Sequence, residues 1–203
     1  MQPSLKPALA LLFAIAGLFL APAARAQVHS AVDAPAPVDL ALGYSYLRGN
    51  APPGGCGCFS MNGGSASLGI PLKSGRFAIL GEATAVRGSH ISDNGYDLAL
   101  NLFTAGLRFK PAMRRTAWQP FGLVLAGGAQ GKGSLVRASL GGDGFGAVAF
   151  ALNVGGGVDY RVNRHFGVRL IQADYLLTTF DNHLNNNQNN LSINAGAVLY
   201  FGR

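Results

Sequence analysis

The most regular pattern in the chain lies at residues 191–201, which read LSINAGAVLYF. Apolar side chains occupy every second position from Leu191 to Phe201, and Ser192, Asn194 and Gly196 lie between them. Successive side chains of a β-strand point to opposite faces, so this alternation predicts a strand with one apolar face and one small or polar face.

Seven more segments of about ten residues alternate in the same way, with glycine, proline, asparagine or charged residues between them. The predicted strands are 38–47, 64–72, 77–86, 98–109, 120–130, 146–160 and 166–178. The alternation changes phase in the first half of 98–109, which predicts a β-bulge near Leu102. In 166–178, Arg169 falls in the apolar phase. Together with 191–201, these segments predict an all-β fold.

The composition is atypical of a water-soluble domain. The 203 residues are 49% hydrophobic and only 12% charged, and 29 of them are glycine, whereas soluble domains have about 25% charged residues and about 7% glycine. So much apolar surface excludes a disordered chain. The longest uncharged apolar runs, 120–129 and 145–158, contain glycines and are shorter than a membrane-spanning helix. A membrane β-barrel accounts for these features, because its backbone groups pair from strand to strand.

Residues 1–26 have the pattern of a secretory signal peptide. Lys6 precedes the uncharged apolar stretch 8–20, and Ala24-Arg25-Ala26 predicts cleavage after Ala26. Cleavage would remove two of the 16 basic residues and none of the 9 acidic ones, which leaves a net charge of +5 (14 − 9). Residues 27–37, QVHSAVDAPAP, are predicted to be a flexible periplasmic lead.

The two faces of the predicted strands differ in kind. One face is rich in glycine, serine and asparagine, which suits the crowded polar lumen of a narrow barrel, so the larger apolar face is expected to contact lipid. Phe121, Leu123 and Leu125 of segment 120–130 belong to that apolar set. A soluble lipocalin-like barrel, which faces its apolar residues inward, is the alternative. Aromatic residues near predicted strand ends fit the interface girdles of a membrane barrel: Tyr44, Tyr46, Trp118, Tyr160, Tyr175, Tyr200 and Phe201.

Connection lengths predict the orientation, because barrels of this kind have short periplasmic turns and longer outer loops. The longer connections are 48–63, 87–97, 131–145 and 179–190, and the shorter ones are 73–76 and 161–165. The connection 110–119 is intermediate, longer than a typical periplasmic turn. Both chain ends are then expected in the periplasm. The predicted fold is an all-β, eight-stranded antiparallel up-and-down transmembrane β-barrel formed by residues 38–203.

Over residues 38–201 the chain resembles the small OmpA-like outer-membrane β-barrel family of Gram-negative bacteria, whose members have eight strands. The most specific match is 194–201, where Asn194, Gly196, Leu199 and Phe201 look like the family's assembly signal. The resemblance implies an outer-membrane location and recognition by the barrel-assembly machinery. Gly202 and Arg203 follow the aromatic residue on which many members end. No peptidoglycan-binding domain is expected after the last strand.

Charged residues on the inward phase are the first candidate site. They are Asp39, Glu82, Arg108, Asp159 and Asp174. An unpaired buried charge is costly, so these side chains are expected to pair across a narrow lumen. The network is either a structural plug, since eight strands leave room only for side chains, or a gate on a narrow ion pathway.

Other candidate residues lie in predicted loops. Cys56 and Cys58 are a candidate disulfide in an oxidising compartment, and no nearby histidine completes a metal site. Ser89-His90 and His183 raise the alternative of a lipid-modifying enzyme, but adjacent strand residues point to opposite faces. The stretch His183–Asn190 is predicted to be a polar outer loop that could face glycans or a partner.

These observations predict an outer-membrane barrel with a structural or surface-interaction role and at most a narrow ion pathway. Its expected surroundings are membrane lipid and the assembly machinery. No catalysis, cofactor or metal is expected, and nucleic acid is not an expected partner because no basic run is interleaved with stacking aromatic residues. A lipid-modifying enzyme, a small porin and a soluble exported binder are the alternatives.

Overall fold

The computed structural model describes residues 37–49, 58–91, 95–111, 116–134, 147–180 and 187–202. The chain divides into two units, residues 1–34 and 35–203, and every described residue belongs to the second. The predicted signal peptide therefore lies outside the described residues, as do residues 27–36 of the predicted lead.

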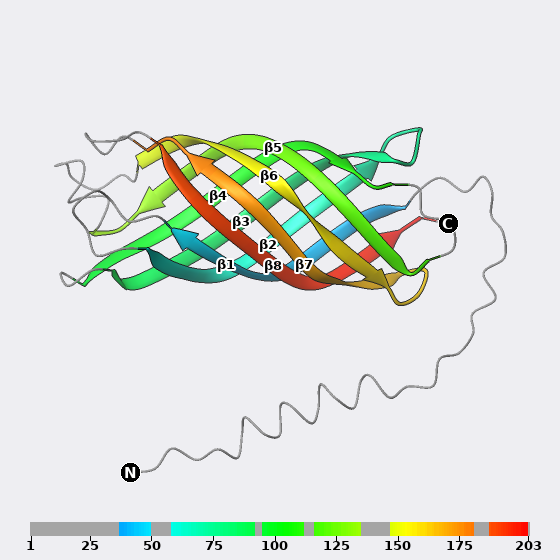
Figure 1. The fold of residues 1–203 in the computed structure, drawn as a ribbon, viewed down its shortest axis with the longest axis horizontal. Coiled ribbons are helices and arrows are strands. Elements are labelled where there is room, and N and C mark those ends of the chain that lie inside the picture. The colour runs from blue at the N-terminus through cyan, green and yellow to red at the C-terminus, as the bar shows by residue number, and fades with distance from the viewer. Residues whose placement is uncertain are drawn as a thin grey trace, which may run out of the picture. The chain divides into compact units, whose positions relative to one another are not determined.

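Eight tilted strands form a closed barrel (Figure 1). Each strand pairs antiparallel with the next along the chain, and β8 pairs with β1. This confirms the predicted eight-stranded up-and-down topology. The strands are β1 (Val38–Gly49), β2 (Phe59–Pro71), β3 (Phe77–Ile91), β4 (Tyr96–Phe109), β5 (Trp118–Lys132), β6 (Ala147–Arg161), β7 (Phe166–Thr178) and β8 (Gln188–Phe201).

The start of β1 and the end of β8 lie at one end of the barrel, which we call the terminal end (Figure 1). A tight turn joins β2 to β3 there: the amide of Gly75 donates to the carbonyl of Leu72 (2.8 Å), and Gly75 has φ +67°. Glycine adopts this left-handed conformation without steric cost. The β6–β7 turn is held by the Asn163 side chain, whose oxygen accepts from the amides of His165 and Phe166.

We call the opposite end the loop end. Its connections are residues 50–58, 92–95, 133–146 and 179–187. The prediction of a long connection at 87–97 was wrong, because β3 continues to Ile91 and β4 begins at Tyr96. Two other predicted boundaries also shift: β2 begins at Phe59 rather than at residue 64, and β8 takes up Gln188, Asn189 and Asn190 from the predicted polar loop.

Large apolar side chains cover the outside of the barrel, as predicted. Phe103 and Val124, for example, are 66% and 53% exposed. Two aromatic pairs lie at the terminal end, where Phe77 contacts Phe109 and Trp118 contacts Tyr160, with ring centroids 5.1 and 5.2 Å apart. Such an exterior is stable against lipid rather than water. Among the described residues, no helix is long and apolar enough to cross a membrane.

On β5 the prediction of which face meets lipid was wrong. Phe121, Leu123 and Leu125 are buried in the interior, and Val124 between them faces outward. Size did not identify the outward face here, because both faces of β5 carry apolar residues. Tyr200 is also an exception, since it is 3% exposed inside the barrel and is not part of an interface girdle.

The predicted bulge near Leu102 is absent. Pairing continues without a shift through Leu102 on both sides of β4, and Leu100 and Leu102 point inward. A bulge lies in β7 instead, where Leu170 and Ile171 are both exposed and the register shifts between Arg169 and Gln172. As a result, Arg169 and Gln172, on either side of the bulge, both point inward, and the Arg169 side chain lies in the interior rather than on the apolar face.

The seam between β1 and β8 depends on a pair of glycines. Gly43 pairs with Gly196, and a Cβ atom at Gly196 would lie 2.1 Å from the carbonyl oxygen of Leu42. No side chain fits at such a separation, so the glycine of the 194–201 pattern is needed for the two strands to approach. Beside it, Asn194 is buried and accepts a hydrogen bond from the Ser45 hydroxyl across the seam, whereas Leu199 and Phe201 face outward.

Candidate functional site in the barrel lumen

Two layers of different chemistry occupy much of the lumen, and a smaller buried apolar cluster of Leu80, Phe121, Leu123 and Leu125 lies beside them. The layer nearer the terminal end, which we call the polar layer, consists of Asp39, Ser67, Glu82, Arg108, Lys110, Asn153, Asp159, Arg169, Gln172 and Asp174. The layer nearer the loop end, which we call the apolar seal, consists of Leu47, Met61, Val86, Leu100, Leu102, Ala129, Ala151 and Leu176.

Asp39 of β1 and Arg108 of β4 form the first ion pair of the polar layer. The two guanidinium NH₂ groups of Arg108 each donate to one carboxylate oxygen of Asp39, and the Nη1–Oδ1 distance is 2.8 Å. Both residues are nearly inaccessible to solvent. Two parallel hydrogen bonds fix the geometry of such a pair and hold it across the lumen.

Asp159 of β6 and Arg169 of β7 form the second pair. The Nε of Arg169 donates to Oδ1 of Asp159 at 2.8 Å, and its Nη1 donates to Gln172 Oε1 at 2.7 Å. Lys110 joins the two pairs, because its Nζ lies 3.8 Å from Asp39 Oδ2 and 3.6 Å from Asp159 Oδ2. Burial lowers the pKa of the Lys110 ammonium and Arg108 adds to that effect, whereas Asp39 and Asp159 oppose it.

Glu82 and Asp174 are connected through an amide rather than a cation. The Nε2 of Gln172 donates to Glu82 Oε2 at 3.1 Å and to Asp174 Oδ2 at 2.7 Å. Asn153 Nδ2 lies 3.4 Å from Glu82 Oε1. The polar layer thus holds four carboxylates and three cations, and the cations lie around Asp39 and Asp159. Asp174 Oδ1 is buried without a hydrogen-bond partner among the described residues.

Aromatic rings support the cations of this layer. The guanidinium of Arg169 lies over the ring of Phe121, 4.7 Å from its centroid. At the terminal end, the guanidinium of Arg161 lies 4.4 Å from the centroid of Tyr200. A cation over an aromatic face gains electrostatic stabilisation. This explains two interior aromatic residues that the sequence pattern assigned to lipid or to an interface girdle.

The apolar seal closes the lumen toward the loop end. Each strand from β1 to β7 contributes at least one residue to it, and Leu98, Phe59 and Phe180 pack against it. Its members are 5% exposed or less. Strand β8 adds the buried Ser192 and Asn190 at this level, which pair with Leu47 and Leu176. Because these are few polar groups among apolar side chains, passage of a hydrated ion through this layer would require it to lose most of its water.

All five charged residues predicted for the lumen are buried there. The predicted network omits Arg169, Lys110 and Gln172, which complete the hydrogen-bonded layer. The alternation does place Gln172 on the same face as Asp174, but it places Arg169 on the opposite, apolar face. The signal for Arg169 was present in the adjacent apolar pair Leu170-Ile171, which breaks the alternation and predicts a bulge. Lys110 follows the end of β4, so no strand periodicity indicated that its side chain turns into the lumen.

The remaining candidates do not form a site within the described ranges. Cys58 is exposed and Cys56 lies outside them, so their disulfide stays a prediction. Ser89 and His90 are both exposed near the end of β3, where His90 has φ +57°, and His183 is not described. No group of three or more metal-ligating side chains occurs in the part of the chain that the structure describes.

Comparison with known proteins assigns this barrel to a family. Residues 10–201 match the family described as outer membrane protein beta-barrel domain. The chain belongs to this outer-membrane β-barrel family. The apolar exterior and the plugged lumen are therefore features of an outer-membrane barrel, and the predicted outer-membrane location agrees with the family. A search of curated proteins finds no match.

Solved structures share the fold of this outer-membrane barrel. Neisserial surface protein A matches with a TM-score of 0.65 and 14% identity, covering 81% of this chain and 97% of that protein. Ail, the attachment invasion locus protein of Yersinia pestis, matches with a TM-score of 0.56 and 17% identity, covering 82% of this chain and 99% of Ail. At sequence identities this low, the matches show a shared fold and nothing about function.

Proposed function

We propose that this outer-membrane barrel is a closed, non-conducting scaffold whose role is to hold surface loops for interaction with external molecules. The observation that carries the proposal is the apolar seal, to which seven of the eight strands contribute. A pore needs a hydrated path, and here the apolar seal occupies the lumen toward the loop end. Toward the terminal end, the ion pairs of the polar layer and buried apolar residues such as Leu80 and Leu125 occupy it.

The connections at the loop end supply the interaction surface in this proposal. Residues 50–58, 133–146 and 179–187 are longer than the turn between β2 and β3, and they contain glycine, serine and asparagine. The two similar structures are named as a surface protein and as an attachment invasion locus protein. A surface role for this chain would be of the same general kind.

Planar-bilayer recording tests the closed lumen. The detergent-folded protein should give no steady conductance, and it should migrate differently on a gel with and without boiling, as folded barrels do. Replacing Leu100 and Leu102 together by serine should introduce hydroxyl groups into the seal and allow brief openings. Steady conductance by the unmodified barrel would overturn the proposal in favour of a small porin.

Loop exchange tests the surface role. Proteoliposomes carrying the barrel should bind members of an array of immobilised glycans and sulfated polysaccharides. A variant with residues 135–145 and 181–186 replaced by short glycine-serine turns should lose that binding and keep its heat-dependent gel shift. Equal binding by both proteins would place the interaction outside the loops and would contradict the proposal.

The route to the membrane is part of the same proposal. The signal peptide 1–26 would direct export with cleavage after Ala26, and Asn194, Gly196, Leu199 and Phe201 would present β8 to the barrel-assembly machinery. N-terminal sequencing of the membrane-inserted protein should begin at Gln27. Removing the Phe201 side chain by Phe201→Ala should slow insertion in cells more than it slows folding into detergent.

The lipid-modifying alternative has a direct test. In cells, His90→Ala and His183→Ala should leave the chemical composition of lipid A unchanged. His90 is exposed and has no hydrogen bond to a serine within the described ranges, and His183 lies outside them. A change in acylation that depends on either histidine would establish an enzyme.

A further inference from the structure

The outward face of β1 to β5 differs from the rest of the exterior near the loop end. Tyr46, Asn62, Arg87, Ala99 and Lys132 follow one another as paired residues from strand to strand. Arg48 lies beside this row and donates to Ser60 Oγ at 3.0 Å, and Tyr46 shares the same hydroxyl at 2.8 Å. We call this group, Tyr46, Arg48, Ser60, Asn62, Arg87 and Lys132, the basic belt.

The cations of the basic belt are uncompensated. Arg48, Arg87 and Lys132 are exposed, and none of them pairs with a carboxylate in the described part of the chain. Asp97 also faces outward nearby on β4, where its backbone amide donates to Ser134 Oγ at 2.8 Å, and its carboxylate forms no ion pair with another described residue. Three cations among hydroxyl and amide groups, next to an apolar barrel wall, match the chemistry of a phosphate-bearing headgroup.

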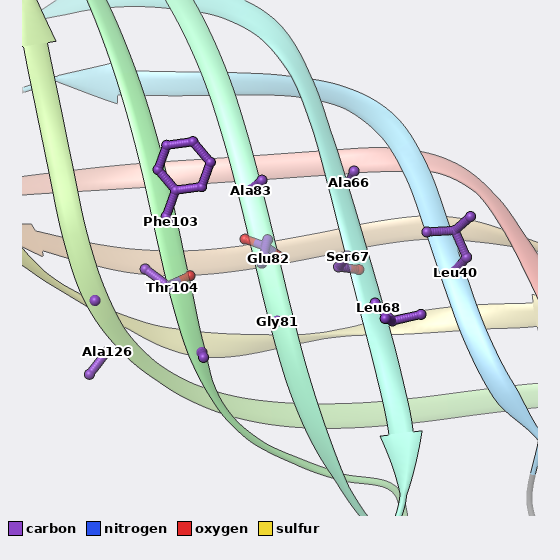
Figure 2. Close-up of a pocket in the computed structure, with 12 residues that line it drawn as sticks. Leu40, Ala66, Ser67, Leu68, Gly81, Glu82, Ala83, Phe103, Thr104 and Ala126 are labelled. Atoms are coloured by element: carbon purple, nitrogen blue, oxygen red, sulfur yellow. The ribbon is translucent and has the colours of Figure 1, made fainter.

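A hollow lies below the basic belt on the same strands. The hollow is shallow and largely open to its surroundings, with a volume of about 560 Å³, and Figure 2 shows its lining residues on neighbouring strands. The small residues Ala66, Gly81, Ala83 and Ala105 form its floor, and the larger Leu68 and Phe103 rise beside them. A Cβ atom placed on Gly81 would meet no atom within 4 Å, so the space above this glycine is open.

The belt and the hollow lie in line along the strands. Arg87 and Ala83 are four residues apart on β3, and so are Asn62 and Ala66 on β2. At about 3.4 Å per residue, the separation is about 14 Å. An acyl chain descending from a headgroup at the belt would therefore reach the hollow while following the barrel wall.

We propose that the β1–β5 face binds an acylated membrane lipid whose headgroup carries phosphate, with the phosphate at Arg48 and Arg87 and one acyl chain in the hollow. The inference rests on the proposed orientation, which places the loop end in the outer leaflet. We infer a lipid rather than a soluble anion, because a soluble anion would contact the basic belt but not the hollow. A second copy of the barrel does not fit this face, because pairing two such faces would bring like charges together.

Diphosphoryl lipid A is the probe for this site. The barrel is placed in phosphatidylcholine nanodiscs that contain a small fraction of the probe, and native mass spectrometry measures the fraction of released barrels that retain it. The unmodified barrel should retain lipid A in preference to phosphatidylcholine. Arg48→Gln with Arg87→Gln should lower retention by about tenfold or more, because the neutral amides cannot form the charge-assisted hydrogen bonds that the two guanidinium groups donate to phosphate.

Gly81→Leu tests the hollow without removing a charge. The leucine should fill the open space and lower retention, while Gly122→Leu, an outward glycine of β5 whose Cβ would meet its nearest atom at 3.8 Å, should leave retention unchanged. Arg76→Gln is the matched control for charge, because Arg76 is exposed at the terminal end. The variants Arg48→Lys and Arg87→Lys should keep most of the binding.

Several outcomes would overturn the inference. Unchanged retention in the Arg48→Gln, Arg87→Gln protein, with an intact heat-dependent gel shift, would remove the belt from the site. Unchanged retention in Gly81→Leu would remove the hollow. Full competition by inorganic phosphate, or a dimer in place of a lipid adduct, would identify a different occupant. Conductance and loop binding do not depend on these variants, so a failure here is distinguishable from failure of the proposed function.

Discussion

The polar layer and the apolar seal fill the same lumen with opposite chemistry. In the polar layer, ion pairs such as Asp39–Arg108 hold distant strands together through directional hydrogen bonds. In the seal, residues such as Leu100 and Leu176 do so through close packing. Substitutions should therefore destabilise the two layers in different ways. In the polar layer, removing one partner of an ion pair leaves the other charge buried and unpaired, whereas in the seal the loss of stability should grow with the side-chain volume removed.

The largest expected effect is at Arg169. Replacing it by methionine leaves Asp159 without its two guanidinium contacts in a buried site. Removing one partner of a buried ion pair costs about 3–5 kcal/mol, so the free energy of unfolding should fall by about that amount. Urea unfolding of the barrel in lipid vesicles measures it. The double variant Arg169→Met, Asp159→Leu should recover part of the loss, and an additive loss would show that the two side chains are not coupled.

The seal should be less sensitive to a single change. Leu100→Ala removes a side chain that is 4% exposed, and it should lower the free energy of unfolding by about 2–4 kcal/mol through the cavity that it leaves. Leu107→Ala is the matched control, because Leu107 lies on the same strand but faces outward and is 52% exposed. Lipid can fill the space left at Leu107, so its loss should be clearly smaller in the same urea titration.

Glycine substitutions test how tightly the polar layer is packed. A Cβ atom on Gly69 would lie 2.5 Å from Nη2 of Arg108 and 2.9 Å from Oδ1 of Asp39. Gly69→Ala should force this ion pair to shift and cost about 1–3 kcal/mol. Gly122→Ala, whose added methyl group has room, is the control and should change stability little. Equal midpoints of unfolding for the two variants would contradict a tightly packed ion pair.

The smallest expected effect concerns the bulge that brings Arg169 inside. Deleting Leu170 should leave a folded barrel, because Asp159 still pairs with Arg169 and Val158 with Ile171 once the extra residue is gone. Deleting Ile193 from the regular part of β8 should prevent folding, because a slip of one residue turns every following side chain to the other face. Heat-dependent gel migration distinguishes these results. Loss of folding after deletion of Leu170 would show that the bulge is required.

Much of the fold was predictable because alternation depends only on neighbouring residues. On β1, Asp39, Ala41 and Ser45 point inward and Leu42 and Tyr44 point outward, as the pattern predicts. On β5 the same reasoning assigned the faces wrongly, because Phe121 and Val124 are both apolar and periodicity does not distinguish lipid from an apolar interior. In the structure, Phe121 lies inside, next to the guanidinium of Arg169 and in one cluster with Leu80.

The sequence by itself determined the eight strands, their closure into an antiparallel barrel and the inward position of Asp39, Glu82, Arg108, Asp159 and Asp174. These follow from period-two alternation and from turn residues, which act over a few positions. Only the tertiary structure decided which charges meet, that Lys110 joins two ion pairs and that residues from seven strands form one apolar seal. Such contacts depend on strand register and on one bulge, and both are set by the packing of side chains far apart in the chain.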